Sequence, residues 1–576
     1  MSRGTRRHLV QTLCAVVLVA SAGACASIPT SGGVMESSAE VDSVSDLGFD
    51  VQGPATDAGP EQIVQGFVSA AQFGPASAAT FDIAREYTTP VAWSAWDEYT
   101  QVLVLSEYPR WTVGEFDDST AVTSVQGEAT VVASLDESGV YTELAEPSVV
   151  DVTFDLARGT DGQWRISGLE DGLLVLADFL GNAFHRTPLY YPTPDREWWV
   201  PDVRWFPGQS WRTAATQAIL DGPPERLAQS AVSVVPDGAT LAIDAVTVAE
   251  NGTIDVSLTS AISSAPPEDR ALLVAQLEAT LREGDGRTVV LSAGTSPLAA
   301  TSAAEPSRPV TVGDAVAVLG AGSEEGQVLR RVVGRELTDP AVPPDLAGLD
   351  VTAVAVGTDD ATVVVRDGAG RLVRVGEDGR SELLVGRRVA PPSIDRFDAV
   401  WTAVGGELRV VLPAGGVVPV EPEWLADLPV RSLRVAPEGA RIALVTDSPD
   451  GPEVWVAAIE RDADEVPTGL STPVRVGGPV DSVEAVEWSE ESTLTLLGRD
   501  PDGARGLFVA GVGGLASSND GLTRPLATTA VPTAVAAGVG ASPTLVLDAD
   551  GTLHVRQSAA LWPVVSEDVV AVAYPG

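Results

Sequence analysis

Residues 310–576 alternate short apolar segments with turns rich in glycine and aspartate, and no stretch among them has the apolar spacing of an amphipathic helix. Three or four such segments recur with a period of about 45 to 50 residues, which is typical of the blades of a β-propeller. A blade cannot bury its apolar faces alone, so this repeat constrains the fold more than any other feature. We predict a mainly β, multidomain protein whose propeller has five or six blades, with six favoured.

Two local features agree with a propeller. The segment at residues 569–574 is placed to pair beside residues 314–319, which would close the ring and remove an exposed sheet edge. The turn Val435-Ala-Pro-Glu-Gly-Ala-Arg-Ile-Ala resembles the Ser-Pro-Asp-Gly turn of TolB-like and WD40-like blades.

Residues 60–185 are predicted to form an α+β domain. Apolar residues lie at helical spacing in residues 60–73 and again in residues 78–87, after which the apolar period changes to that of strands. The expected strands cover residues 101–105, 111–116, 128–135 and 147–156, and the turn at residues 161–166 opens another. Helices followed by a curved antiparallel sheet resemble the NTF2-like (cystatin-like) cone, in which a turn such as Asp161-Gly-Gln-Trp-Arg-Ile is common.

NTF2-like cones often hold a pocket. Trp93, Trp96, Asp97 and Glu98 are the residues that could line one here, although packing and surface roles are favoured for them.

Residues 186–305 are predicted to form a small α/β domain. A helix at residues 212–220 ends at Asp221-Gly-Pro-Pro, because the prolines forbid its continuation. The clearest amphipathic helix covers residues 268–282. The expected strands cover residues 231–235, 244–249, 253–258 and 288–291, with Asn251-Gly252 as a hairpin turn.

The N-terminus has the three parts of a signal peptide. A basic region with three arginines precedes the apolar residues 9–20, and Ser21-Ala-Gly-Ala-Cys25 follows. The apolar run is too short for a comfortable span of about 20 residues. A small-residue tetrad closed by cysteine resembles the lipobox of bacterial lipoproteins, which predicts cleavage between Ala24 and Cys25 and acylation of Cys25, with palmitate among the chains. The alternative is an ordinary signal peptide with a coincidental cysteine.

Cysteine content favours the lipobox. Cys14 lies in the predicted leader at residues 1–24, so Cys25 is the one thiol of the mature chain, and acylation gives an exported protein a reason to keep it. Residues 25–59 are rich in Ser, Gly, Ala and Asp and are expected to be a flexible tether. We therefore predict a lipid-anchored protein on the outer face of the cytoplasmic membrane.

Charge and side-chain content exclude several classes of function. The net charge is −44, and removal of Arg3, Arg6 and Arg7 with the leader makes it −47, which opposes nucleic-acid binding. His185 and His554 are the mature chain's histidines, so a His/Cys zinc site or a Cys–His nucleophile cannot be assembled. Ser-His-Asp remains formally possible, but no Gly-x-Ser-x-Gly elbow is present.

Three turns could suggest calcium. They begin at Asp447, Asp500 and Asp548, yet none continues into the twelve-residue EF-hand pattern, and Asp and Gly are ordinary hairpin residues. We predict no catalytic residue, no metal ligand and no cofactor.

Motifs in a fixed order resemble LpqB, a family of actinobacterial lipoproteins. They are Cys25-Ala-Ser-Ile-Pro-Thr-Ser-Gly, Leu189-Tyr-Tyr-Pro with Trp199-Val-Pro-Asp-Val-Arg-Trp, Ile219-Leu-Asp-Gly-Pro-Pro with Gln276-Leu-Glu-Ala-Thr-Leu, and Pro391-Pro-Ser-Ile-Asp-Arg-Phe with Trp401. The third pair resembles the GerMN domain of sporulation and germination proteins. Two departures are Glu438, where Asp is usual, and the glycine-rich segment near Val512, which is hard to align.

The resemblance implies an NTF2-like N-terminal region, a GerMN-like domain and a C-terminal propeller. It also implies binding to the extracytoplasmic part of the sensor kinase in the MtrA–MtrB two-component system, with an influence on cell wall and division.

Three functions are compared. The leading hypothesis is an interaction protein that modulates an envelope sensor kinase through propeller loops, with the GerMN-like groove as a second candidate surface. The second is a binder of a cell-wall fragment or lipid in the NTF2-like cone, and the third is a hydrolase with clustered carboxylates of raised pKa. Partner-binding residues stay unknown, since Trp401, Trp455 and Trp488 are expected in blade cores.

Overall fold

The computed structural model describes residues 51–117, 121–282, 287–298, 305–320, 326–358, 362–376, 379–449, 451–528 and 531–576. All of these belong to one compact unit, Gly48–Gly576. The predicted leader, the cleavage pair Ala24 and Cys25, and most of the tether lie outside the described residues. No helix in these ranges is long and apolar enough to cross a membrane.

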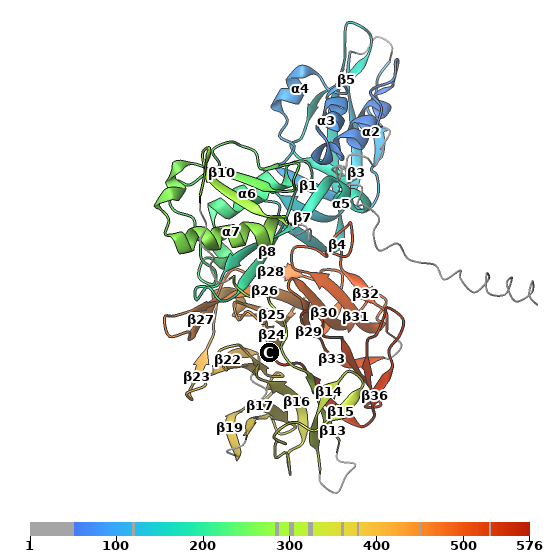
Figure 1. Ribbon diagram of the computed structural model, residues 1–576. Helices are drawn as coiled ribbons and strands as arrows, with labels where there is room; N and C mark the ends of the chain where they lie inside the picture. The colour runs from blue at the N-terminus through green and yellow to red at the C-terminus, as the bar shows by residue number, and fades with distance from the viewer. Residues whose placement is uncertain are drawn as a thin grey trace, which may run out of the picture. The chain divides into compact units, whose positions relative to one another are not determined.

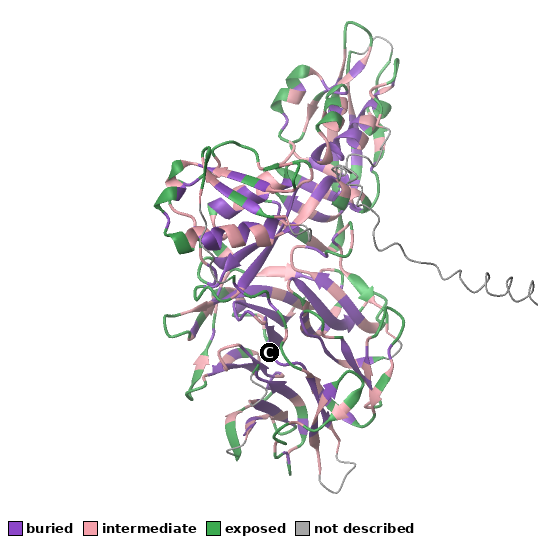
Figure 2. Cartoon of the chain, in the orientation of Figure 1, coloured by how far each residue is buried: buried purple, intermediate pink, exposed green. Residues whose placement is uncertain are grey.

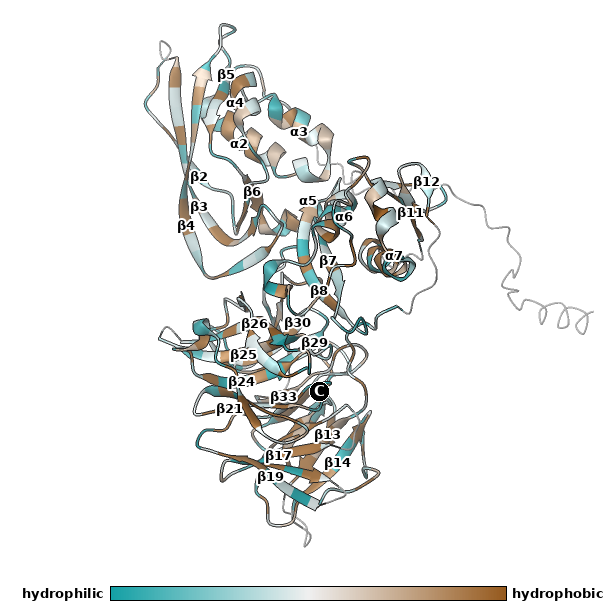
Figure 3. Ribbon diagram, turned by 90° about the vertical axis from the view of Figure 1, so that its left-hand side faces the viewer, coloured by the Kyte–Doolittle hydropathy of each residue, from teal (hydrophilic) through white to brown (hydrophobic). Residues whose placement is uncertain are grey.

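The N-terminal domain packs helices on one face of a six-stranded sheet (Figure 3). The sheet order is β5-β4-β3-β1-β6, with β2 beside β3, and β1 and β6 run parallel. The helices are α2 (Pro60–Ala71), α3 (Ala78–Arg85), α4 (Pro90–Ala95) and α5 (Leu180–Ala183). The strands are β1 (Gln101–Leu105), β2 (Arg110–Val113), β3 (Val122–Asp136), β4 (Tyr141–Arg158), β5 (Trp164–Leu169) and β6 (Leu173–Leu176).

Local signals explain the helix starts in this domain. Pro60 and Pro90 each occupy the first turn, where a missing N–H costs nothing. The Gln62 side chain accepts a hydrogen bond from the N–H of Gly59, and Thr89 Oγ1 accepts one from the N–H of Ala92. Both predicted helices are present, whereas α4 was not predicted from the sequence.

Aromatic side chains fill the space between these helices and the sheet. Phe67 packs edge-on against Trp96 and Phe154, with ring centroids 5.4 and 6.0 Å apart. Trp96 is buried, and its indole N–H donates to the carbonyl of Gly172, while Trp93 packs against it. The packing role favoured for these two tryptophans is therefore confirmed.

The middle domain joins a hairpin, two helices and a small sheet of order β12-β11-β10-β9. Its elements are β7 (Phe184–Pro192), β8 (Trp199–Pro207), α6 (Trp211–Asp221), β9 (Thr247–Val248), β10 (Ile254–Leu258), α7 (Pro267–Leu281), β11 (Val289–Ala293) and β12 (Ser296–Pro297). Helix α6 ends at Gly222, whose φ of 90° is a conformation that side chains disfavour.

The structure corrects two strand predictions in this domain. Residues 231–235 form no strand, because Ala231 and Val234 are buried as an irregular segment tied by the N–H of Val232 to the carbonyl of Pro192. The strand expected at residues 244–249 is reduced to β9.

In its described residues the propeller contains six successive sheets, which lie around the C-terminal residue (Figure 1). The first sheet contains β13 (Ala315–Leu319), β14 (Val328–Val333), β15 (Glu336–Thr338) and β37 (Val569–Ala573), and the second contains β16 (Val351–Val356), β17 (Val363–Asp367), β18 (Arg371–Gly376) and β19 (Gly379–Val385). The third sheet contains β20 (Ser393–Ile394), β21 (Val400–Val404), β22 (Glu407–Val411) and β23 (Val417–Pro419), and the fourth contains β24 (Val430–Val435), β25 (Arg441–Ser448), β26 (Gly451–Arg461), β27 (Pro467–Leu470) and β28 (Val474–Val476). The fifth sheet contains β29 (Ser482–Glu490), β30 (Thr493–Arg499), β31 (Arg505–Gly511) and β32 (Arg524–Leu526), and the sixth contains β33 (Pro532–Ala536), β34 (Leu545–Asp548), β35 (Leu553–Val555) and β36 (Val564–Ser566).

The last strand closes the ring. β37 pairs antiparallel with β13, with Val316 opposite Ala573, which confirms the predicted closure. Buried residues are concentrated in the strands and exposed ones in the connecting turns (Figure 2). Trp401 and Trp488 are buried in blade cores as predicted, but Trp455 is only half-buried.

The Asp–Gly turns act as hairpin turns where the structure describes them. The carboxylate of Asp500 accepts the N–H of Ala504, and that of Asp548 accepts the N–H groups of Asp550 and Thr552. These oxygens satisfy the turn backbone.

Candidate functional site: the hairpin between the domains

The β7–β8 hairpin carries the two sequence motifs around Tyr190 and Trp199, and the fold brings them together. Tyr190 lies opposite Pro201 and Leu189 lies opposite Asp202 in the antiparallel register. Every residue of β8 except its last is buried. The hairpin is thus an internal element of the molecule, and its side chains pack against α6 and α7 and against the propeller.

Polar contacts fix the hairpin to the fifth sheet of the propeller. Arg186 Nε donates to the carbonyl of Gly514 at 2.9 Å, and its Nη2 donates to Ser492 Oγ at 2.9 Å. Trp205 Nε1 donates to the carbonyl of Gly513 at 3.0 Å. Trp205 is buried and Arg186 is half-buried, so the loss of an acceptor would leave a poorly solvated donor unpaired.

Tyr190 is the centre of a second contact. Its hydroxyl donates to Glu491 Oε2 at 2.6 Å, and the guanidinium of Arg308 lies over its ring at 4.3 Å. Burial raises the pKa of the Tyr190 hydroxyl, and the neighbouring Glu491 carboxylate raises it further. The hydroxyl therefore acts as a neutral donor, and Arg308, which follows the middle domain, ties the linker to the same point.

The tip of the hairpin is held by Arg396 of the third sheet. Arg396 forms an ion pair with Asp195, and its Nε donates to the carbonyl of Glu438 at 2.9 Å. Burial alone would raise the pKa of the Asp195 carboxyl, but hydrogen bonds from Thr193 and Arg396 outweigh burial and lower that pKa. Asp195 is therefore held as an anion.

Glu438 explains one departure from the expected turn sequence. Its carboxylate is fully buried and accepts a hydrogen bond from Arg441 Nε at 2.7 Å, while Arg441 Nη2 donates to the carbonyl of Glu491 at 2.7 Å. The pair joins the turns of the fourth and fifth sheets beneath the hairpin, and glutamate has the length to make this link.

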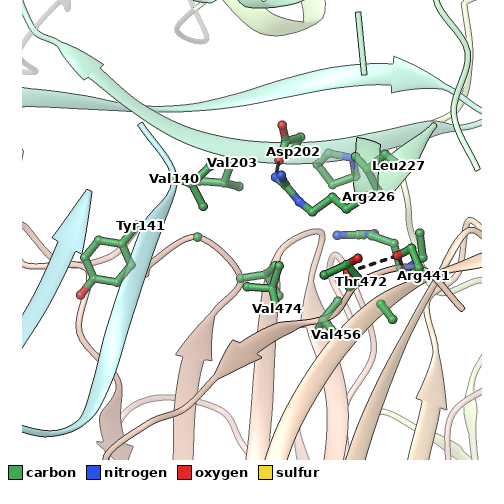
Figure 4. A pocket seen from close by; sticks show the side chains of 16 residues that line it. Val140, Tyr141, Asp202, Val203, Arg226, Leu227, Arg441, Val456, Thr472 and Val474 are labelled. Carbon is green, nitrogen blue, oxygen red and sulfur yellow. Dashed lines mark hydrogen bonds and ion pairs between the residues drawn. The ribbon is translucent and has the colours of Figure 1, made fainter. Parts of the chain in front are cut away.

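A small cavity lies where the three domains meet (Figure 4). Asp202 of β8, paired with both Arg204 and Arg226, faces it from one side, and Arg441 faces it from the other. Its volume is about 40 Å³, which holds a few water molecules but no organic ligand. The junction is an interface between domains.

The N-terminal domain reaches the same propeller loop through the start of β4. The hydroxyl of Tyr141 donates to the carbonyl of Asp520, and the Glu143 carboxylate accepts from the N–H and hydroxyl of Thr523 at 2.8 and 2.6 Å. Burial raises the pKa of the Glu143 carboxyl to about 7, although the two Thr523 bonds oppose the shift. Glu143 is therefore an acid that titrates near neutral pH at a domain contact.

The glycine-rich segment that resisted alignment is this docking loop. Gly513 and Gly514 have φ of 76° and 86°, and a Cβ on Gly513 would lie 2.7 Å from the Cβ of Val203. Glycine permits both the backbone turn and the close approach of β8. The glycines were visible in the sequence, but nothing there indicated what approaches them.

Larger cavities lie beside the junction. One of about 660 Å³ separates the N-terminal sheet from α6; apolar Leu135 and Phe184 line it, together with the polar groups of Tyr99, Gln217 and Asp221. Others of about 540 and 260 Å³ border the third and fourth sheets of the propeller. The largest of these is in the size range of small-molecule sites and borders the core of the N-terminal domain, to which Leu135 and Phe184 belong.

The histidines and the carboxylates of raised pKa have partners of their own. His185 stacks on Trp211 with ring centroids 3.9 Å apart, and His554 Nε2 lies 3.1 Å from Asp548 Oδ2. Burial raises the pKa of Glu487, which is paired with Arg434. Within the described ranges, no group of three His, Cys, Asp or Glu side chains is placed to hold a metal.

The fold and the junction define a multidomain protein in which a hairpin joins an α+β domain and a small α/β domain to a closed propeller. Residues 53–180 match the family described as "Lipoprotein LpqB, N-terminal domain", residues 326–575 match "Lipoprotein LpqB beta-propeller domain", and residues 188–298 match "Sporulation and spore germination". The chain belongs to the LpqB family of lipoproteins.

Curated relatives span nearly the whole chain. A lipoprotein LpqB of Bifidobacterium longum is 26% identical over 87% of both chains, and one of Streptomyces coelicolor is 28% identical over 100% of this chain and 99% of its own. Among solved structures, a chain in "Crystal structure of Nidogen/Laminin Complex" is 9% identical, with a TM-score of 0.33, over 45% of this chain and 98% of its own.

Proposed function

We propose that this lipoprotein is a non-catalytic accessory of an envelope two-component system. It is anchored through Cys25 to the outer face of the cytoplasmic membrane and binds the extracytoplasmic domain of an MtrB-like sensor kinase, with effects on cell wall and division. The supporting observation is the junction: side-chain hydrogen bonds and ion pairs couple the N-terminal domain and the middle domain to the propeller, so binding at one part can be transmitted to another.

Anchoring makes modest affinity sufficient. Confinement of both partners to one membrane plane raises their effective concentration, so a partner surface need not be large. The acidic mature chain would favour a basic partner surface and faster association at low salt.

Two measurements test this proposal. Calorimetric titration of unlipidated residues 26–576 against the purified kinase domain should give saturable binding, and its absence would remove the adaptor function. In cells, Cys25→Ala should move the protein from the membrane to the soluble fraction, whereas Cys14→Ala, in the removed leader, should not.

A second candidate function is supported by the cavity of about 660 Å³, which combines apolar walls with the polar groups of Tyr99, Gln217 and Asp221. It would take a cell-wall fragment or a lipid. To test it, envelope extracts are screened by thermal shift against the wild type and against Ala218→Trp. Ala218 lines the cavity, and the larger tryptophan side chain would occupy part of it. A ligand that stabilises both proteins equally would not be in this cavity.

A further inference from the structure

Strand β4 is paired on one side only over residues 148–153. On that side it follows β3 in unbroken register, from Val131 opposite Ser148 to Gln126 opposite Thr153. On the other side β5 begins to pair only at Phe154, and no other strand of the described part of the chain lies along this stretch. Residues 146–151 are all exposed, with Val149 at 61% and Val150 at 37%.

The direction of the backbone groups follows from the ends of the ladder. The N–H of Arg158 donates to the carbonyl of Ala121, on the β3 side. N–H and C=O groups of successive residues in a strand point to alternate sides, so even-numbered residues of β4 face β3. Val149 and Asp151 therefore direct their N–H and C=O groups outward, where the described structure offers them no partner.

Both ends of this open edge are defined. The register of β3 and β4 shifts beyond the pair of Val131 and Ser148, and Pro147, the neighbour of Ser148 on β4, has a ring nitrogen that cannot donate. At the other end β5 takes over at Phe154. The six residues between span about 20 Å, which is the length of one ordinary strand.

The charge of the edge indicates what it can accept. Asp151 lies directly opposite Glu128 of β3, a like-charged pair that disfavours the bare sheet, and Asp155 shares the face of Asp151. Arg110 of β2, opposite Glu128, offsets one of these three charges. Pairing with a second copy of the same edge would bring acidic side chains together, whereas a basic strand would neutralise them.

We propose that residues 148–153 of β4 form a docking edge that takes up an extended, basic segment of a partner protein as an added strand. Main-chain hydrogen bonds to Val149 and Asp151 would supply affinity, and the carboxylates would select lysine or arginine. This deepens the proposed function, because it assigns the surface at which the partner binds.

The first test uses amide hydrogen exchange on unlipidated residues 26–576. In the free protein the amides of Val149 and Asp151 should exchange rapidly, while those of Val150 and Val152, which face β3, should be slow and act as internal controls. A synthetic peptide, acetyl-Lys-Val-Lys-Val-Lys-amide, at millimolar concentration should slow exchange at Val149 and Asp151 at least tenfold. Unchanged exchange would overturn the proposal.

Two variants sharpen the test. Val149→Pro removes an outward N–H without touching the β3 ladder, and its matched control, Val149→Thr, keeps that N–H. Asp151→Lys reverses the charge and tests the edge independently if the proline variant unfolds. Peptide protection should be lost in Val149→Pro and Asp151→Lys and kept in Val149→Thr.

Binding of the purified kinase domain to the wild type and to Asp151→Lys provides a separate test. If it binds wild type and Asp151→Lys equally, the docking edge is wrong while the proposed function stands. If it binds neither but the peptide still protects Val149 and Asp151, the kinase function fails and the docking edge remains. Binding that weakens at least tenfold in Asp151→Lys, but not in Val149→Thr, supports both.

Discussion

At the scale of single residues, the domain contacts rest on groups whose burial has measurable consequences. Glu143 is the clearest, because its carboxylate sits at the contact between β4 and the Thr523 loop with a pKa raised from 4.5 to about 7. The folded protein holds this proton more tightly than the unfolded chain. This contribution to stability is complete below pH 4.5 and is lost as pH rises through 7.

The variant Glu143→Gln should remove this pH dependence. Glutamine can accept the N–H of Thr523 and donate to its hydroxyl at every pH. Between pH 4.5 and 8, the free energy of unfolding should fall by up to about 3 kcal/mol more in the wild type than in the variant. Urea unfolding across this range measures it, with Glu137→Gln on the exposed β3–β4 turn as the control. Parallel profiles for all three proteins would contradict the assigned role of Glu143.

Alanine substitutions at Gly513 and Gly503 distinguish the cost of backbone strain from the cost of a steric clash with a neighbouring strand. Both have positive φ, 76° and 82°, but a Cβ at Gly513 meets Val203 at 2.7 Å, whereas one at Gly503 meets nothing within 4 Å. Gly503→Ala should cost about 1 kcal/mol, and Gly513→Ala about 2 to 4 kcal/mol, because it also pushes β8 away. Equal losses in chemical denaturation would mean that the loop does not dock tightly on β8.

At the scale of elements, the sequence predicted best the strands and helices that bury one face. α2 and β10 have clear apolar periods, α7 buries the leucines of its predicted stripe, and all three elements lie where they were predicted. The hairpin β7–β8 was missed because both of its faces are buried, so its strands show no alternation. Its prolines are unusual in strands, but each strand of a two-stranded ribbon is an edge, where proline is tolerated.

The junction itself was beyond sequence reasoning for a related reason. Arg186, Tyr190 and Arg396 look like ordinary polar residues in the chain, and their partners lie about 200 to 330 residues away. The ring closure was predictable, since β37 has the apolar pattern that β13 requires.

Removal of residues 569–576 should open the propeller. β13 would then expose an unpaired edge, and Ala571 and Ala573 would leave the core that they share with Val316 and Val318. We expect loss of cooperative thermal unfolding and aggregation in size-exclusion chromatography. Tyr574→Phe, which loses only the hydroxyl bond to the carbonyl of Pro543, should remain monodisperse and shift the midpoint by a few degrees. A truncated protein that still unfolds cooperatively would show that β37 is dispensable.

At the scale of the whole molecule, the described domains should unfold as one unit because the hairpin is buried between them. Arg396 tests this coupling, since it links Asp195 at the hairpin tip to the carbonyl of Glu438 in the propeller and is largely buried. Arg396→Met leaves the Asp195 anion without its cation. It should lower the free energy that couples the middle domain to the propeller by about 1 to 3 kcal/mol. Arg409→Met, whose ion pairs to Glu407 and Glu421 stay within one sheet, should cost less than about 1 kcal/mol.

In scanning calorimetry, the wild type and Arg409→Met should show one transition. Arg396→Met should show the middle domain separating as an earlier transition, because the propeller keeps its own closed ring. Two transitions already present in the wild type would mean that the junction is too weak to transmit binding from one domain to another.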